Sequence, residues 1–165
     1  MTNFLRQSME ETLQVTHYNL RELAPIESQQ FRKRVADKYT SGKTHPSLFW
    51  ELVAGYGGFS ICDSDAWQWL DEFIKERKFI LFFEESNDPT VYIAAAKQKF
   101  QEFLEEFPDY IFYVTNESLD YLIYFNDSDY LRCIGSAEPW LRQKVKQLSQ
   151  NSWKDIDGRS FLDGV

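Results

Sequence analysis

An unbroken run of five apolar residues, Phe79 to Phe83, constrains the fold of this chain more than any other feature of its sequence. The run has no polar position that would face water, so it shows neither the alternation of a half-exposed strand nor the spacing of an amphipathic helix. Short continuous runs of this kind are typical of a β-strand that is buried on both faces. The sequence therefore predicts a sheet in the second half of the chain.

Helical spacing dominates before this run. Apolar residues recur every three or four positions in segments that begin near Phe4, Pro25, Pro46 and Ala66. Proline suits the first turn of a helix, because an N–H group there would have no intrahelical partner. The segment Gly55–Gly58 interrupts the pattern. We interpret it as a structural loop rather than a phosphate-binding one, because no Lys-Ser or Lys-Thr pair follows it.

Strand signals dominate after the run. The further expected strands cover residues 91–93, 110–115, 119–125 and 130–134. A short polar turn joins 110–115 to 119–125, which predicts a hairpin. Apolar residues at helical spacing between Ala96 and Phe107 predict a helix that connects two strands by a crossover. Such a connection is long enough to join parallel strands, so the sequence allows one parallel pair of strands in the sheet. A last helix is expected around Leu141–Leu148.

This order of elements predicts an α+β fold. N-terminal helices are followed by a mixed or antiparallel sheet of about four strands, with helices packed mainly on one face. Residues 1–150 are expected to form a single α+β domain, because the length suits one core and no linker divides it. Residues 151–165 predict a loosely packed C-terminal tail.

The sequence shows no signal for a membrane or a secreted protein. No apolar stretch approaches the ~20 residues of a membrane-spanning helix, and Met1–Glu11 lacks the apolar segment of a signal peptide. We therefore expect a cytoplasmic protein without membrane association. Cys62 and Cys133 lie far apart and form no CxxC motif, so we interpret them as ordinary buried thiols rather than as a disulfide or metal ligands.

The net charge of −8 is concentrated in the middle of the chain. Between Glu84 and Asp129 there are eleven acidic and two basic residues, whereas Phe31–Lys43 contains five basic residues and one acidic residue. An acidic segment repels phosphate, which argues against a nucleic acid as the main partner. It would attract a basic protein partner, although a general contribution to solubility explains the same charge.

No arrangement of residues specifies a reaction. Asp127 and Asp129 follow an apolar strand, as carboxylates that hold a divalent cation can do, but two carboxylates are too few for a dedicated metal site. A turn closed by Asx hydrogen bonds explains these residues equally well. His17 and His45 are the only histidines, and neither belongs to a motif. We therefore predict no catalytic residues, no metal and no cofactor.

An acidic and aromatic segment around the expected hairpin is the candidate contact surface for a partner. Tyrosine is favoured in protein interfaces, and acidic residues accelerate the encounter with a basic protein. Alternate residues of a strand face opposite sides, so either one row of tyrosines is exposed or the tyrosines pack beneath helices. The candidate partner-binding residues are Tyr113, Glu117, Asp120, Tyr121, Asp127 and Asp129.

The segment from Tyr110 to Gly135 resembles a block in small, uncharacterised bacterial proteins. The block has a strand, a short polar turn, an aromatic residue and an apolar strand, then an Asn and a closing Gly. Phe79–Glu84 fits the same pattern upstream, whereas Tyr121 and Asp127 stand where those proteins favour Trp and His. The resemblance covers about a third of the chain. It implies an acidic protein of immunity type, which neutralises a toxin, and it implies no catalytic residues.

These observations favour a non-catalytic protein-binding domain, of immunity or antitoxin type, that binds a basic partner. The first alternative is an enzyme or small-ligand binder that uses Asp127 and Asp129 with a metal. Thermal stabilisation by manganese or magnesium, lost in Asp127→Asn, would distinguish this alternative. The second alternative is a structural subunit of a larger assembly, which monomeric behaviour at high concentration would disfavour.

Overall fold

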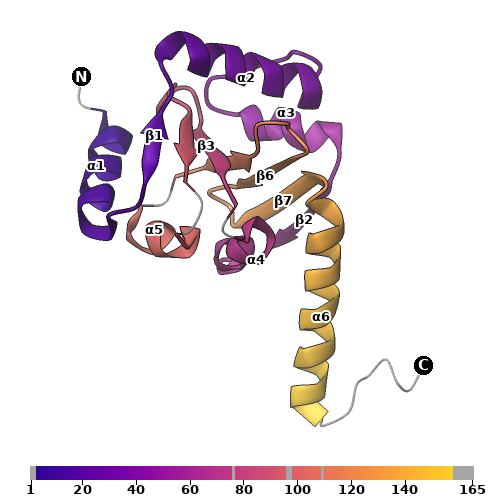
Figure 1. Ribbon diagram of the computed structural model, residues 1–165. Helices are drawn as coiled ribbons and strands as arrows, with labels where there is room; N and C mark the ends of the chain where they lie inside the picture. The colour runs from indigo at the N-terminus through magenta and orange to yellow at the C-terminus, as the bar shows by residue number, and fades with distance from the viewer. Residues whose placement is uncertain (1–2, 76, 96–97, 109, 158–165) are drawn as a thin grey trace.

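The run Phe79–Phe83 forms strand β3, and all five of its side chains are buried. The computed structural model describes residues 3–75, 77–95, 98–108 and 110–157, and of residues 151–157 it describes the backbone alone. β3 belongs to a sheet of seven strands in the order β1-β4-β3-β5-β6-β7-β2, in which all neighbours are antiparallel (Figure 1). The other strands are β1 (Leu20–Glu22), β2 (Phe59–Cys62), β4 (Tyr92–Ala94), β5 (Phe112–Thr115), β6 (Tyr121–Phe125) and β7 (Tyr130–Gly135).

The first helix precedes the first strand, and the other helices except the last lie between strands in the chain, so the expected order of helices first and sheet afterwards holds only in part. Pro25 lies in the first turn of α2, and Phe31, Val35 and Tyr39 form its buried stripe, as their spacing predicts. The helices are α1 (Phe4–Thr16), α2 (Pro25–Tyr39), α3 (Phe49–Tyr56), the short 3-10 helix η1 (Ala66–Trp69), α4 (Leu70–Ile74), α5 (Phe100–Glu106) and α6 (Glu138–Asp157). The α+β architecture expected from the sequence is therefore confirmed.

The predicted sheet of about four strands is too small. β3, β7 and the hairpin of β5 and β6 lie where the apolar patterns place them, and β4 overlaps the short strand expected at 91–93. The prediction lacks β1 and β2, which have three and four residues and lie at the two edges of the sheet. Each pairs with a strand that is distant in sequence, β1 with β4 and β2 with β7. Long-range pairing, which no local pattern reveals, makes these segments strands.

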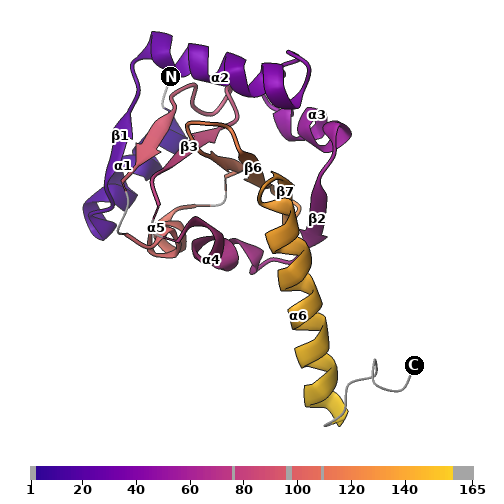
Figure 2. The same ribbon diagram turned by 45° about the vertical axis from the view of Figure 1, so that its right-hand side comes forward.

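Helices cover both faces of the sheet, because the side chains of β3 alternate between two cores. Phe79, Leu81 and Phe83 belong to one core, together with buried residues of α1, α4, α5 and α6. Ile80 and Phe82 belong to the other core, with α2 and α3. Figure 1 and Figure 2 show α2 and α3 on one side of the sheet, with α4 and α5 on the other. The expectation that helices pack mainly on one face is thus corrected, since β3 has no face that tolerates water.

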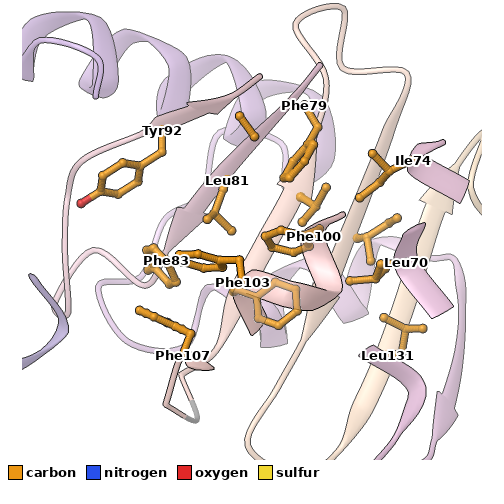
Figure 3. Close-up of a cluster of buried hydrophobic side chains, with 14 of the residues drawn as sticks. Leu70, Ile74, Phe79, Leu81, Phe83, Tyr92, Phe100, Phe103, Phe107 and Leu131 are labelled. Atoms are coloured by element: carbon orange, nitrogen blue, oxygen red, sulfur yellow. The ribbon is translucent and has the colours of Figure 1, made fainter. Parts of the chain in front are cut away.

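Aromatic rings fill the larger core (Figure 3). The rings of Phe79 on β3 and Phe100 on α5 meet edge to face, with centroids 4.8 Å apart. Phe100 and Phe103 stack at 5.8 Å, and Phe107 continues the row against Phe83 at 5.5 Å. Buried aromatic side chains of this kind dominate the energetics of a core. Much of the unusual aromatic content of the chain therefore serves its interior.

The basic residues of α2 mostly serve the fold rather than an exposed surface. Arg32 donates hydrogen bonds of 2.8 to 2.9 Å to three backbone carbonyl oxygens at and beyond the end of β3. Lys38 donates to the carbonyl oxygen of Leu119, in the turn between β5 and β6, at 2.6 Å. Lys33 forms an ion pair with Asp37 one turn along the helix. Charge-assisted hydrogen bonds are stronger than neutral ones, so Arg32 and Lys38 tie α2 to the sheet.

α5 carries the chain from β4 to β5, past the strand that separates them. β4 and β5 both pair antiparallel with β3, on its two sides. They therefore run in the same direction without being neighbours, and the parallel pair that the sequence left open does not form. The crossover brings the end of α5 to the end of the sheet at which β5 begins, next to the end of β6.

α6 extends away from the sheet (Figure 2). Its first turns are anchored in the larger core by Leu141, which is fully buried next to Ala137. The helix continues to Asp157, so the first seven residues of the predicted tail 151–165 are helical, and residues 158–165 lie outside the described residues. No helix in the described part of the chain is both long and apolar enough to cross a lipid bilayer.

Cys62 and Cys133 lie on neighbouring strands as free thiols. Cys62 is exposed and pairs with Tyr130 in the ladder of β2 and β7, whereas Cys133 is buried opposite Phe59. Three ladder positions separate the two cysteines, roughly 10 Å, which is too far for a disulfide. Burial raises the pKa of the Cys133 thiol. Cys133 is thus the buried thiol that the sequence predicts, and Cys62 is not.

At two glycines, Gly135 and Gly58, a side chain would clash with neighbouring atoms, and at a third, Gly55, it would not. Gly135 ends β7 at a φ of +74°, and a Cβ atom there would lie 2.4 Å from the carbonyl oxygen of Asp120. Gly58 allows the loop after α3 to approach β7, because a Cβ atom would lie 2.6 Å from the carbonyl oxygen of Cys133. Gly55, inside α3, has no atom within 4 Å of the equivalent position. The segment Gly55–Gly58, interpreted as a loop from the sequence, is thus corrected in part, because Gly55 and Tyr56 belong to α3 and only its last two residues lie outside the helix.

Replacing Gly135 and Gly55 by alanine should change the free energy of unfolding in opposite directions. Gly135→Ala should lower it by more than about 1 kcal/mol, because alanine is strained at positive φ and clashes with the neighbouring backbone. Gly55→Ala should raise it by up to about 1 kcal/mol, because alanine favours the helix over glycine. Urea denaturation followed by circular dichroism measures both changes. A change of the same sign in both variants would contradict the backbone geometry of these two positions.

Candidate functional site

The six candidate partner-binding residues do not form one surface. They comprise two strand residues, two residues of the β5–β6 turn and two of the β6–β7 turn: Tyr113 and Tyr121, Glu117 and Asp120, Asp127 and Asp129. The two turns lie at opposite ends of the five-residue strand β6 and are therefore separated by roughly 14 Å or more. The expectation of one continuous acidic and aromatic surface is corrected by this separation.

The two tyrosines are buried on opposite faces of the sheet. Tyr113 is fully buried, and its ring stacks on that of Phe82 with centroids 4.9 Å apart. Tyr121 is 7% exposed and meets Phe73 of α4 edge to face at 4.8 Å. Neither ring can contact a partner from its position. The tyrosines thus pack beneath helices, which is the alternative that the sequence left open.

The β5–β6 turn lies against basic residues of α2. Arg34 donates a hydrogen bond to the carbonyl oxygen of Glu117 at 3.1 Å, and Lys38 is bonded to the same turn. Asp120 is exposed, and its Oδ2 accepts a hydrogen bond from the side-chain amide of Asn116 at 2.9 Å. Positive charges beside this turn would repel a basic partner. For this reason Glu117 and Asp120 do not belong to the surface that we propose below.

A buried asparagine fixes the conformation of the β6–β7 turn. Oδ1 of Asn126 accepts hydrogen bonds from the backbone N–H groups of Ser128 and Tyr130, at 3.1 and 3.0 Å. This is the Asx turn that the sequence predicts. Asp129 adopts a φ of +64°, and its carbonyl oxygen accepts a hydrogen bond from the N–H group of Asp63 at 2.9 Å. These bonds fix the backbone of the turn that carries the exposed side chains of Asp127 and Asp129.

An open groove of about 450 Å³ lies beside this turn. Its walls come from η1, from the end of α5 and the segment after it, and from the ends of β5 and β6. We call it the acidic groove. The residues that line it are Ser64, Trp67, Gln68, Leu104, Glu105, Phe107, Pro108, Tyr110, Phe112, Phe125, Asn126, Asp127 and Asp129.

Aromatic side chains form the apolar part of the acidic groove. Phe112 and Phe125 face each other across β5 and β6 with ring centroids 6.0 Å apart. Phe107 and Tyr110 form a second pair at 5.7 Å. Trp67 and Tyr110 are only half-buried, so part of each ring faces solvent. The groove therefore offers flat apolar surfaces that water can reach.

Among the described residues that line the acidic groove, the charged ones are all acidic, namely Glu105, Asp127 and Asp129. Glu105 accepts a hydrogen bond from the side chain of Gln101 at 3.2 Å. The carboxylates of Asp127 and Asp129 are exposed, and no described side chain forms a hydrogen bond or an ion pair with them. The negative charge of the groove is thus not compensated by the side chains around it.

This arrangement suits the recognition of an organic cation. Aromatic faces attract cations through their quadrupole, and carboxylates accept charge-assisted hydrogen bonds from them. A divalent metal prefers more oxygen ligands than two carboxylates supply. Within the described ranges of the chain, no three His, Cys, Asp or Glu side chains lie close enough together to hold a metal ion.

Trp67 and Glu105 are residues of the groove that the sequence analysis missed. They lie on η1 and α5, far from the β6–β7 turn in sequence. No local pattern indicates that these segments meet the turn. The crossover helix is the only signal, because a helix that leads into β5 must end where β5 begins, next to the end of β6.

The chain matches no protein-family model, and no curated protein and no solved structure is significantly similar to it. Function must therefore be inferred from the side chains that the fold brings together. The acidic groove is the place where uncompensated negative charge and accessible aromatic surface coincide.

Glu84 is a buried carboxylate directly after β3, on the face covered by α2 and α3. Its Oε1 accepts a hydrogen bond from the hydroxyl group of Tyr113, and its Oε2 accepts one from the backbone N–H group of Phe49 at 3.2 Å. Burial raises the pKa of Glu84, and the hydrogen bond from Tyr113 opposes that shift. Both oxygens have donors, so this carboxylate serves the packing of α3 on the sheet.

The raised pKa of Glu84 predicts that the protein loses stability as the pH rises. Above the ordinary glutamate pKa of 4.5, and up to the higher pKa of the folded state, the folded protein binds more protons than the unfolded chain. The free energy of unfolding therefore falls with rising pH in that window. Glu84→Gln should flatten this part of the profile, measured by urea denaturation at a series of pH values.

Glu85→Gln is the matched control for this experiment, because it removes the same formal charge from an exposed neighbouring side chain. Its pH profile should keep the wild-type slope. Equal flattening in both variants, or a wild-type slope in Glu84→Gln, would contradict the prediction that burial of Glu84 causes the pH dependence.

Proposed function

We propose that this chain is a non-catalytic protein-binding domain whose acidic groove holds an arginine side chain from a basic segment of its partner. The observation that carries this proposal is the composition of the groove. Three carboxylates and accessible aromatic faces line it, and no cation of the described chain is among its lining residues. The net charge of −8 has the same sign as the groove, so the whole molecule would attract such a partner.

Arginine fits this groove better than lysine does. A guanidinium group is planar and weakly hydrated, so it can stack on an aromatic face such as Trp67 or Tyr110. Its N–H groups remain free at the edge of the plane to donate to the carboxylates of Asp127 and Asp129. A lysine ammonium group can do only one of these well at a time. A volume of about 450 Å³ also leaves room for part of the peptide that carries the side chain.

A toxin-neutralising role is one specific form of this proposal. The resemblance of residues 110–135 to bacterial proteins of immunity type supports it, and so does a binding site with a charge opposite to that of a basic toxin. Co-expression with toxins encoded next to the gene should restore growth. The absence of rescue by any such toxin pair would count against the immunity form, while arginine binding is judged by the experiment below.

Neutralising the carboxylates of the β6–β7 turn should weaken the binding of arginine. The probe is a short peptide with two arginines, compared with a peptide in which citrulline replaces both. The double variant Asp127→Asn/Asp129→Asn should bind the arginine peptide at least about tenfold more weakly, because charge-assisted hydrogen bonds are lost. Asparagine keeps the turn, since it tolerates positive φ. Titration followed by the NMR amide shifts of residues 126–129 measures the affinity.

The double variant Glu117→Gln/Asp120→Asn is the matched control, because it removes two charges from the turn at the opposite end of β6. It should keep the wild-type affinity for the arginine peptide. Equal losses in both double variants would show that binding follows net charge and not the groove. Equal binding of the citrulline peptide would refute the recognition of arginine.

A further inference from the structure

A second cavity, of about 480 Å³, lies at the other end of the sheet, on the face covered by α2. Its walls come from β1, from α2, from the beginning of β3, from β4 and from the β5–β6 turn. Three of its lining side chains, Arg21, Arg34 and Lys78, are basic. We call it the cationic cavity. It shares no lining residue with the acidic groove.

The register of the sheet builds the apolar floor of the cationic cavity. Arg21 pairs with Ile93 in the ladder of β1 and β4, and Ile93 pairs with Ile80 in the ladder of β4 and β3. Paired residues point to the same side, so these three side chains form one row across the sheet. Phe31 of α2 and Lys78, just before β3, also line the cavity. The basic groups thus surround apolar surface.

The basic groups of the cationic cavity are available to a ligand, in contrast to most of those on α2. Arg21 and Lys78 are exposed, and neither side chain forms a hydrogen bond or an ion pair with a described residue. Arg34 donates one hydrogen bond to the carbonyl oxygen of Glu117, and its guanidinium lies over the ring of Phe31 at 5.6 Å. Because a guanidinium has five N–H donors, Arg34 keeps several for a further acceptor.

Two carboxylates, Glu27 and Glu117, also line the cationic cavity. Its described lining residues therefore include three cations and two anions, a local excess of positive charge in a protein with a net charge of −8. Such an excess suits a ligand with a single anionic group. A strongly acidic protein segment would instead meet both carboxylates and the overall negative charge of the molecule.

We propose that the cationic cavity binds a small organic anion. One phosphate or carboxylate group lies between Arg21, Arg34 and Lys78, and an apolar body lies on Ile80 and Ile93. Guanidinium groups match the geometry of both anions, and the ammonium group adds a further donor. The volume is in the range of small-molecule sites. This site is independent of the acidic groove and does not rest on arginine recognition there.

Four simple probes separate the parts of this proposal. Phenyl phosphate and phenylacetate both carry an apolar ring, with a phosphate or a carboxylate group. Benzyl alcohol carries the ring without the charge, and inorganic phosphate carries the charge without the ring. Titration of the full chain with each probe, followed by the NMR amide shifts of residues 79–80, 93 and 116–118, reports binding at the cavity.

Phenyl phosphate, phenylacetate or both should give saturable shifts at these positions, and the stronger of the two identifies the anionic group. Arg21→Gln/Lys78→Gln should raise the dissociation constant at least about tenfold, because two charge-assisted contacts are lost. Both side chains are exposed, so this double variant should keep its melting temperature. Lys33→Gln/Lys43→Gln removes the same charge from exposed positions outside the cavity and should bind as the wild type does.

Four results would overturn the proposal. Unchanged binding in Arg21→Gln/Lys78→Gln would show that the cations do not hold the ligand. Equal shifts with benzyl alcohol would show that apolar contact alone explains the binding. Equal shifts with inorganic phosphate would show that charge alone explains it. Shifts with a glutamate-rich peptide but with neither aromatic anion would replace the small ligand by an acidic protein segment.

Discussion

β3 has no polar face, and all five of its side chains must be removed from water. One layer of helices can cover only one face of a sheet, so this strand requires a second layer. α2 and α3 supply it, while α1, α4, α5 and α6 contribute to the core on the other face. Once both faces are covered, the polar side chains of the sheet residues can reach solvent mainly where strands end. The acidic groove and the cationic cavity each lie at one such end of the sheet.

Local patterns predicted the strands that form with their sequence neighbours. β3, β7 and the hairpin of β5 and β6 are visible as apolar runs separated by turn residues. Leu20–Glu22 and Phe59–Cys62 are short and include polar positions, and they become strands only through pairing with β4 and β7. For a related reason, the sequence did not decide whether Tyr113 and Tyr121 are buried or exposed. Alternation tells which residues share a face, but not whether helices cover that face.

Local sequence patterns also predict only part of each candidate site. The sequence predicts the turn that carries Asp127 and Asp129. It does not predict that Trp67, which is distant in sequence, lines the same groove, because the tertiary fold brings the two segments together. The sequence shows a run of basic residues in α2, yet Arg32 of this run donates hydrogen bonds to backbone carbonyl oxygens. The cationic cavity takes only Arg34 from that run, whereas Arg21 and Lys78 come from other segments of the chain. The number of charges in a stretch of sequence therefore does not tell which charged side chains bind other groups of the fold and which remain available to a ligand.

The shortness of the two edge strands has a consequence for how these molecules behave in crowded solution. An exposed strand edge is a template on which another chain can add, and the two edges of this sheet are β1 and β2, with three and four residues. The apolar and aromatic strands β3, β5 and β6 have both neighbours in place, so their backbone groups are not available to another chain. Aggregation by strand addition to the folded protein would therefore have to start on these two short edge strands, one of which carries Arg21 and Glu22.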